Sequence, residues 1–84
     1  MMEIWYSRTE RCEFCVYQSW FKFKYYYLYA YRYRNSSKWY TVGAHVTYKS
    51  ARKWLKKVVG DPGRMKRVEQ LPDGLTAKTR EAAE

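Results

Sequence analysis

Residues 21–34 alternate between two kinds of side chain. Every odd position holds an aromatic residue, and these are Phe21, Phe23, Tyr25, Tyr27, Tyr29, Tyr31 and Tyr33. The even positions mix basic residues with apolar ones and read Lys22, Lys24, Tyr26, Leu28, Ala30, Arg32 and Arg34. A period of two with aromatic residues on one side is typical of a β-strand that buries one face. We therefore predict a strand whose odd positions face the core.

A second strand is predicted over residues 39–49, after a turn formed by Asn-Ser-Ser-Lys at residues 35–38. A tight turn at the two serines fixes the register and pairs Tyr31 with Val42. The even positions of the second strand then join the aromatic face, and these are Tyr40, Val42, Ala44, Val46 and Tyr48. The opposite face of the two strands combines basic residues with Tyr26, Trp39 and His45.

An amphipathic helix is predicted over residues 51–60. Its apolar residues recur at intervals of three and four, and they are Ala51, Trp54, Leu55, Val58 and Val59. This stripe should pack on the aromatic face of the sheet. We expect Ser50 to be the N-cap and Gly60 the C′ residue. The remaining face of the helix is basic and consists of Arg52, Lys53, Lys56 and Lys57.

The two ends of the chain carry weaker patterns. Residues 3–7 and 13–17 look like strands, but no Gly or Pro marks a turn between residues 12 and 34. One strand through that whole stretch would be unusually long, so we expect a reversal near Gln18 and Ser19, or a bulge. After the turn signal Asp61-Pro62-Gly63, residues 64–71 fit an edge strand or a second helix, and we favour the strand.

Together these elements predict an α+β fold, in which an antiparallel sheet of three to four strands packs on one amphipathic helix. We expect residues 1–75 to form a single basic domain and residues 76–84 a frayed C-terminal tail. The chain has 84 residues, of which 20% are aromatic. That aromatic content argues against disorder, while the small size leaves little room for a deep catalytic cleft.

Charge is distributed unevenly along the chain. The net charge is +9, and every acidic residue lies outside residues 14–60, a stretch that contains ten basic residues. Ordinary protein surfaces intersperse both signs because like charges repel each other, so a field of one sign suggests an anionic partner. The plainer alternative is a basic surface that serves only solubility.

The basic and aromatic residues of the predicted sheet and helix suggest an interface for nucleic acid, because rings stack on bases while Lys and Arg neutralise phosphates. The candidate binding residues are Arg52, Lys53, Lys56, Lys57, Lys49, Lys22, Lys24, Arg32, Arg34, Tyr26, Trp39 and His45. Arg52 and Lys53 are the strongest candidates, because the dipole at the first turn of a helix disfavours positive charge. The hypothesis requires these cations to share one continuous side of the molecule.

Binding partners other than nucleic acid would also account for some of these residues. Tyr26 and Leu28 would fit equally well beneath another strand or a partner subunit, so a homodimer through Tyr26, Leu28 and Trp39 is an alternative. A membrane partner is not expected, since the apolar stripe of the helix belongs to the core and no apolar stretch reaches about 18 residues. Glu3 near the N-terminus does not fit a signal peptide, so we expect a cytoplasmic protein.

Patterns for metal binding and catalysis are weak. Cys12 and Cys15 form a C-x-x-C pair, but His45 is the only further ligand of the usual type and a structural zinc site needs four. In a strand the two thiols would also point to opposite faces. We therefore expect reduced cysteines, no metal and no cofactor. Because no nucleophile or acidic cluster accompanies His45, we expect a protein that is not an enzyme and has no small-molecule substrate.

The segments 39–43 (WYTVG) and 50–55 (SARKWL) resemble the sheet-and-helix DNA-binding modules at the N-termini of phage integrases. They are also similar to the end of double-stranded-RNA-binding domains, where a Lys-rich helix follows three strands. These likenesses imply binding of DNA or RNA. In size, architecture and absence of catalytic residues, the chain also resembles the small phage-encoded anti-CRISPR proteins. That resemblance implies an inhibitor that blocks a defence ribonucleoprotein by occupying its surface.

Overall fold

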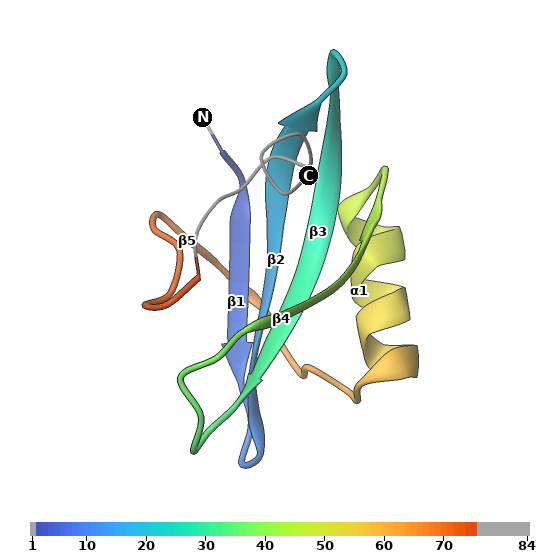
Figure 1. The fold of residues 1–84 in the computed structure, drawn as a ribbon. Helices are drawn as coiled ribbons and strands as arrows, with labels where there is room; N and C mark the ends of the chain where they lie inside the picture. Colours follow the sequence, from blue (N-terminus) through green and yellow to red (C-terminus); the bar gives the residue numbers. More distant parts are fainter. Residues whose placement is uncertain (1, 76–84) are drawn as a thin grey trace.

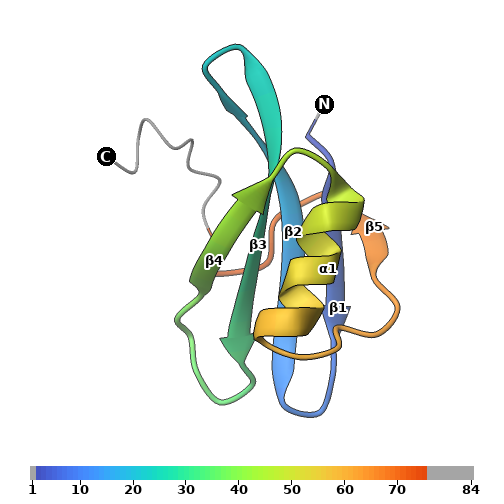
Figure 2. The same cartoon turned by 90° about the vertical axis from the view of Figure 1, so that its right-hand side faces the viewer.

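The structure is a computed structural model that describes residues 2–75. Its antiparallel sheet has five strands in the order β4-β3-β2-β1-β5, and the helix α1 lies against one face (Figures 1 and 2). The elements are β1 (Ile4–Arg8), β2 (Cys12–Phe21), β3 (Lys24–Tyr33), β4 (Tyr40–His45), α1 (Tyr48–Val58) and β5 (Lys66–Val68). The α+β class is confirmed, with five strands where three to four were predicted. The tail predicted at residues 76–84 lies outside the described residues.

The long stretch without Gly or Pro folds into the hairpin of β2 and β3. The chain reverses at Lys22 and Phe23, so the reversal predicted at Gln18 and Ser19 was misplaced. Both turn residues have positive φ, 49° at Lys22 and 63° at Phe23. Hairpin turns of this kind usually contain Gly, Asn or Asp, which is why nothing in the sequence signalled the turn.

The odd aromatic positions in the middle of β3 face α1, as predicted. Tyr29 is buried, and Tyr27 and Tyr31 pack against the same cluster, which includes Leu55 of α1. Toward the two ends of β3 the rings are exposed. The period of two therefore identified the buried side of the strand correctly.

The register between β3 and β4 differs from the prediction. Tyr31 lies opposite Tyr40, where Val42 was predicted. The connection is longer than a tight turn at the two serines would be, because β3 ends at Tyr33 and β4 begins only at Tyr40. The predicted register assumed the shortest connection that the turn residues allow.

A β-bulge changes the register a second time. The shift lies between Tyr29 and Ala30, and beyond it Ala44 pairs with Leu28. Because a one-residue slip moves a side chain to the other face, Ala44 packs on the side away from α1, contrary to the prediction. β4 also ends at His45, so the strand is shorter than the predicted residues 39–49.

The helix begins earlier than predicted. Its N-cap is Thr47, whose side-chain oxygen accepts a hydrogen bond from the backbone N–H of Ser50 at 3.1 Å. Ser50 therefore lies inside the first turn and is not the N-cap. The predicted end is confirmed, because the helix closes with a hydrogen bond from the N–H of Gly60 to the carbonyl oxygen of Leu55 at 3.2 Å.

Only part of the predicted apolar stripe of α1 is buried. Ala51 and Leu55 have no exposed surface, whereas Trp54 is 38% and Val58 55% exposed. Trp54 lies at the border of the helix and stacks on His45, the last residue of β4.

The face of the sheet away from α1 forms a second core. Leu28 and Ala30 are buried there together with Leu75, and Trp39 and Leu71 pack against them. This face, which was predicted to show an accessible mixture of basic and aromatic residues, is covered by the segment that follows β5. That segment lies across the sheet from α1 (Figure 1). The edge strand predicted within residues 64–71 is confirmed as β5, which pairs with β1.

Candidate nucleic-acid interface

The outer surface of α1 carries a group of lysines that we call the lysine row, Lys49, Lys53, Lys56 and Lys57. Spacings of three and four residues place neighbouring members on one side of a helix. All four side chains are exposed. Lys56 lies 4.0 Å from Asp61, but both side chains are at least 60% exposed, so this ion pair contributes little to stability.

The other members of the lysine row are less engaged. The Nζ of Lys57 lies 4.6 Å from the centre of the Trp54 ring, a cation–π arrangement on the surface. Lys49 and Lys53 have no ion-pair partner within residues 2–75. The predicted cations of the helix thus come together, with one exception.

That exception is Arg52, whose guanidinium is engaged by the fold itself. Its guanidinium donates a hydrogen bond to the carbonyl oxygen of Gly63, in the loop after the helix. The side chain also lies beside Tyr48, one turn earlier. Arg52 therefore has a structural partner that the sequence did not show. Because the helix begins at Tyr48, Arg52 and Lys53 also lie beyond the first turn, so the dipole argument that singled them out does not apply.

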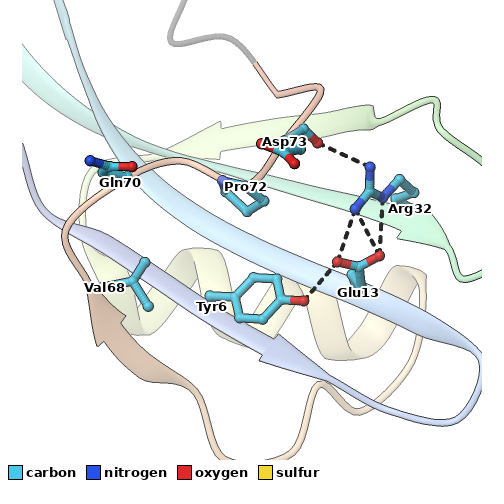
Figure 3. Close-up of a pocket in the computed structure, with 7 residues that line it drawn as sticks. All are labelled: Tyr6, Glu13, Arg32, Val68, Gln70, Pro72 and Asp73. Carbon is cyan, nitrogen blue, oxygen red and sulfur yellow. Dashed lines mark hydrogen bonds and ion pairs between the residues drawn. The ribbon is translucent and has the colours of Figure 1, made fainter.

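Arg32 lies on the other side of the sheet, in a pocket of about 300 Å³ (Figure 3). Its guanidinium donates to both carboxylate oxygens of Glu13 at 2.9–3.1 Å and to the carbonyl oxygen of Asp73 at 3.0 Å. Its plane lies 4.8 Å over the ring of Trp39, whose Nε1 also donates to the Asp73 carbonyl oxygen. Arg32 and Trp39 thus hold the segment after β5 against the sheet.

Glu13 is stabilised as a carboxylate in this pocket. Burial opposes its ionisation, but hydrogen bonds from Tyr6 and Arg32 and the charge of Arg32 outweigh that cost. The pKa of Glu13 is therefore lower than usual. The pKa of Tyr6 is raised, first by burial and then by its 2.7 Å hydrogen bond to Glu13. Figure 3 shows these groups bonded to one another, which marks the pocket as a structural network.

The remaining predicted cations lie at the two ends of the β2–β3 hairpin. Lys22 lies in its turn and Lys24 directly follows it, with the Nζ of Lys24 5.8 Å from the centre of the Tyr26 ring. Arg34 follows the opposite end of β3 and donates to the carbonyl oxygen of Thr9 at 3.3 Å. Because the lysine row and Arg32 lie on opposite sides of the sheet, the expectation of one continuous side for all predicted cations is wrong. The binding interface predicted across both the sheet and the helix is therefore not formed, and only the cations of α1 remain as a candidate.

His45 lies on the helix side, although the sequence placed it on the other face. Its ring stacks between Tyr29 at 5.5 Å and Trp54 at 5.8 Å, measured between ring centres. Its Nε2 is also 3.4 Å from the hydroxyl oxygen of Tyr29. His45 thus joins the edge of the sheet to the helix through Trp54.

The two cysteines point to opposite faces of the sheet, as predicted from their spacing. Cys12 belongs to the core beneath α1 and Cys15 to the second core. Burial raises the pKa of the Cys15 thiol to about 12 and also raises that of Cys12. Within residues 2–75, no three His, Cys, Asp or Glu side chains gather in a way that could hold a metal ion.

One exposed group of aromatic residues was not predicted from the sequence. Among the strands of residues 2–75, the strand pairing of residues 19–26 stays within the β2–β3 hairpin, because β2 pairs with β1 only as far as Tyr17 and β3 pairs with β4 only as far as Tyr27. This two-stranded projection, here called the β2–β3 arm, extends beyond the rest of the sheet (Figures 1 and 2). On it Trp20 is 45%, Phe23 91% and Tyr25 48% exposed. The exposure of these rings could be recognised only once the turn and the lengths of the neighbouring strands were known.

Comparisons with known proteins found no relative of this chain. No protein-family model, curated protein or solved structure matches the chain. In the part of the chain that the structure describes, no helix is both long and apolar enough to cross a membrane.

Proposed function

We propose that this domain binds nucleic acid without catalysis, and that the lysine row of α1 contacts the phosphate backbone. The observation that carries the proposal is the accumulation of four exposed lysines on one helix surface, relieved by a single weak ion pair within residues 2–75. Lys49 and Lys53, like Lys53 and Lys57, are four residues apart, and such like-charge pairs destabilise a helix. Phosphates facing this surface would remove that repulsion.

The structure narrows the set of residues that we assign to binding. Arg32 and Trp39 are engaged in holding the segment after β5, and Arg52 binds the loop at Gly63. The sheet face opposite α1 is covered, so stacking of bases on that face is no longer part of the proposal. The contact surface is instead the outside of α1.

Measurement of affinity against salt concentration tests the proposal. Labelled single- and double-stranded DNA and RNA would be titrated with the protein, and fluorescence anisotropy recorded at several salt concentrations. We expect Lys53→Glu with Lys57→Glu to weaken binding by about tenfold or more and to reduce the slope of log K against log salt. For every phosphate that is no longer neutralised, the slope should change by about 0.7 to 0.9.

A matched control separates the site from the total charge. Lys38→Glu with Lys66→Glu makes the same change in charge at exposed positions outside α1, and Lys38, like Lys57, lies over an aromatic ring. Equal effects of the two double variants would contradict a role for the lysine row. Binding to a ribonucleoprotein with little salt dependence, and no binding to free oligonucleotide, would instead indicate the inhibitor class that the anti-CRISPR resemblance suggests.

A further inference from the structure

The β2–β3 arm presents aromatic rings that the fold itself does not need. Trp20 and Tyr25 form a cross-strand pair with ring centres 4.8 Å apart in an edge-to-face arrangement, and each is about half exposed. Phe23 at the tip is 91% exposed. An apolar group of this kind on a projecting ribbon marks a binding surface.

The tip of the arm is held in an unfavourable backbone conformation. Lys22 and Phe23 both have φ in the left-handed region, where a residue with a side chain is strained. Gly at position 23 would adopt this φ without strain and would sacrifice almost no packing, given the exposure of the ring. The turn thus places an exposed aromatic ring at the tip of the arm even though the backbone there is strained.

Two of the exposed rings, Trp20 and Tyr25, lie on the same side of the sheet as α1. Alternation along β3 places Tyr25 on the side of Tyr27, which faces the helix, and Trp20 is the cross-strand partner of Tyr25. Tyr27 contacts Tyr48 in the first turn of α1, with ring centres 6.4 Å apart. The arm thus rises from the end of the molecule at which α1 and its lysine row begin (Figure 2).

The charge on the arm favours a polyanion as its partner. Lys22 and Lys24 lie on the arm, with Nζ atoms 5.3 Å from the Phe21 ring and 5.8 Å from the Tyr26 ring. Alternation places Lys24, Phe21 and Tyr26 on the face of the arm opposite Trp20 and Tyr25. No acidic residue occurs in residues 19–26. A two-stranded arm that carries exposed rings and cations suits a single strand, since unpaired bases can stack on the rings while the flexible backbone brings phosphates to the cations.

We propose that the β2–β3 arm binds single-stranded nucleic acid, with unpaired bases stacking on Trp20, Phe23 and Tyr25 while the lysine row holds the adjoining backbone. This inference rests on the proposed function and adds the strandedness of the ligand and the residues that contact its bases.

The test compares two tyrosines on one strand. Tyr25→Ala removes a ring that is 48% exposed on the arm, and Tyr33→Ala removes one that is 50% exposed at the other end of β3. With a labelled single-stranded oligonucleotide, we expect Tyr25→Ala to weaken binding about tenfold and Tyr33→Ala to change it less than about twofold. The salt slope should stay the same in both. Duplex of the same length should bind the wild type more weakly.

A second variant tests whether a loss of affinity could result from a loss of folding. Phe23→Gly removes the outermost ring and relieves the strain at that position, so the melting temperature should rise while single-strand affinity falls. Quenching of tryptophan fluorescence on binding should be largely lost in Trp20→Phe, because we expect stacked bases to quench that ring.

The outcomes separate this inference from the proposed function. If the lysine-row variant loses affinity but Tyr25→Ala and Tyr33→Ala bind equally, the arm has no role and only this inference fails. If the lysine-row variant also binds normally, the proposed function fails as well. Equal binding of duplex and single strand, or Phe23-dependent binding to phosphatidylserine vesicles without binding to oligonucleotide, would overturn the inference.

Discussion

Arg32 and Glu13 lie directly opposite each other on β3 and β2, and the guanidinium Nη2 is 2.9 Å from the carboxylate Oε2. Both side chains are only 15% exposed. The same guanidinium reaches the carbonyl oxygen of Asp73, so one side chain joins two strands and the segment after β5. Arg32, which was predicted from the sequence to bind phosphate, thus holds the segment that covers the second core.

Removing this guanidinium should destabilise the fold strongly. We expect Arg32→Gln to lower the free energy of unfolding by about 3 kcal/mol, because it leaves the buried Glu13 carboxylate without its charged partner. Arg34→Gln is the control, since Arg34 is exposed and makes one 3.3 Å hydrogen bond; it should cost less than about 0.5 kcal/mol. Urea unfolding measures both. Equal stability of the two variants would show that the pair contributes little.

The same pair should make stability depend on pH. The pKa of Glu13 is lower in the folded protein than in the unfolded chain, where a Glu titrates near about 4.3. The unfolded state therefore binds the proton more readily, and the contribution of Glu13 is complete above that value and is lost as the pH falls through the lower folded pKa. We expect Glu13→Gln to flatten the acid limb of stability against pH, measured by urea unfolding between about pH 3 and pH 6. An unchanged acid limb would contradict the assignment.

Much of the fold could be predicted from side-chain periodicity. The alternation in residues 21–34 identified the buried side of β3, and the spacing of Ala51 and Leu55 identified the helix and its inner face. These patterns are local, because burial on one side of an element is recorded in its own sequence. The end of α1 at Gly60 could also be predicted from the sequence.

The errors arose where geometry depends on residues far apart in the chain. The turn at Lys22 and Phe23 uses positive φ without Gly, and the bulge after Tyr29 has no local signature. The partner of Arg32 could be found only from the register between β2 and β3. The candidate site was affected by these errors. Lys53, Lys56 and Lys57 were correctly predicted to share one face of the helix, but Lys49 was assigned to the preceding strand and the exposed rings of the arm were missed.

The thiols should be unreactive in the folded protein. Cys15 has no exposed surface, and burial raises its pKa to about 12, so almost no thiolate forms near neutral pH. Cys12 is 6% exposed and its pKa is also raised by burial. We expect a thiol reagent to modify both residues at the rate of unfolding, with full reaction only in denaturant. Rapid modification of the native protein at pH 8 would show that the sheet opens around β2.

Gly43 should be intolerant of any side chain, because the Tyr29 ring lies across it. A Cβ at this position would be 2.6 Å from the hydroxyl oxygen of Tyr29 and 3.0 Å from the carbon that carries it. Tyr29 is 5% exposed and stacks on His45, so its ring cannot move without disturbing the stack between β4 and α1. We expect Gly43→Ala to destabilise the protein by about 1 to 3 kcal/mol in urea unfolding.

A second substitution tests the cause of that destabilisation. Tyr29→Phe removes the hydroxyl that makes the closest approach, so the double variant Gly43→Ala with Tyr29→Phe should recover part of the stability that Gly43→Ala removes. Recovery should be incomplete, because the ring carbon at 3.0 Å remains. If the two substitutions are simply additive, the penalty comes from the backbone of β4 and the Tyr29 ring is not its source.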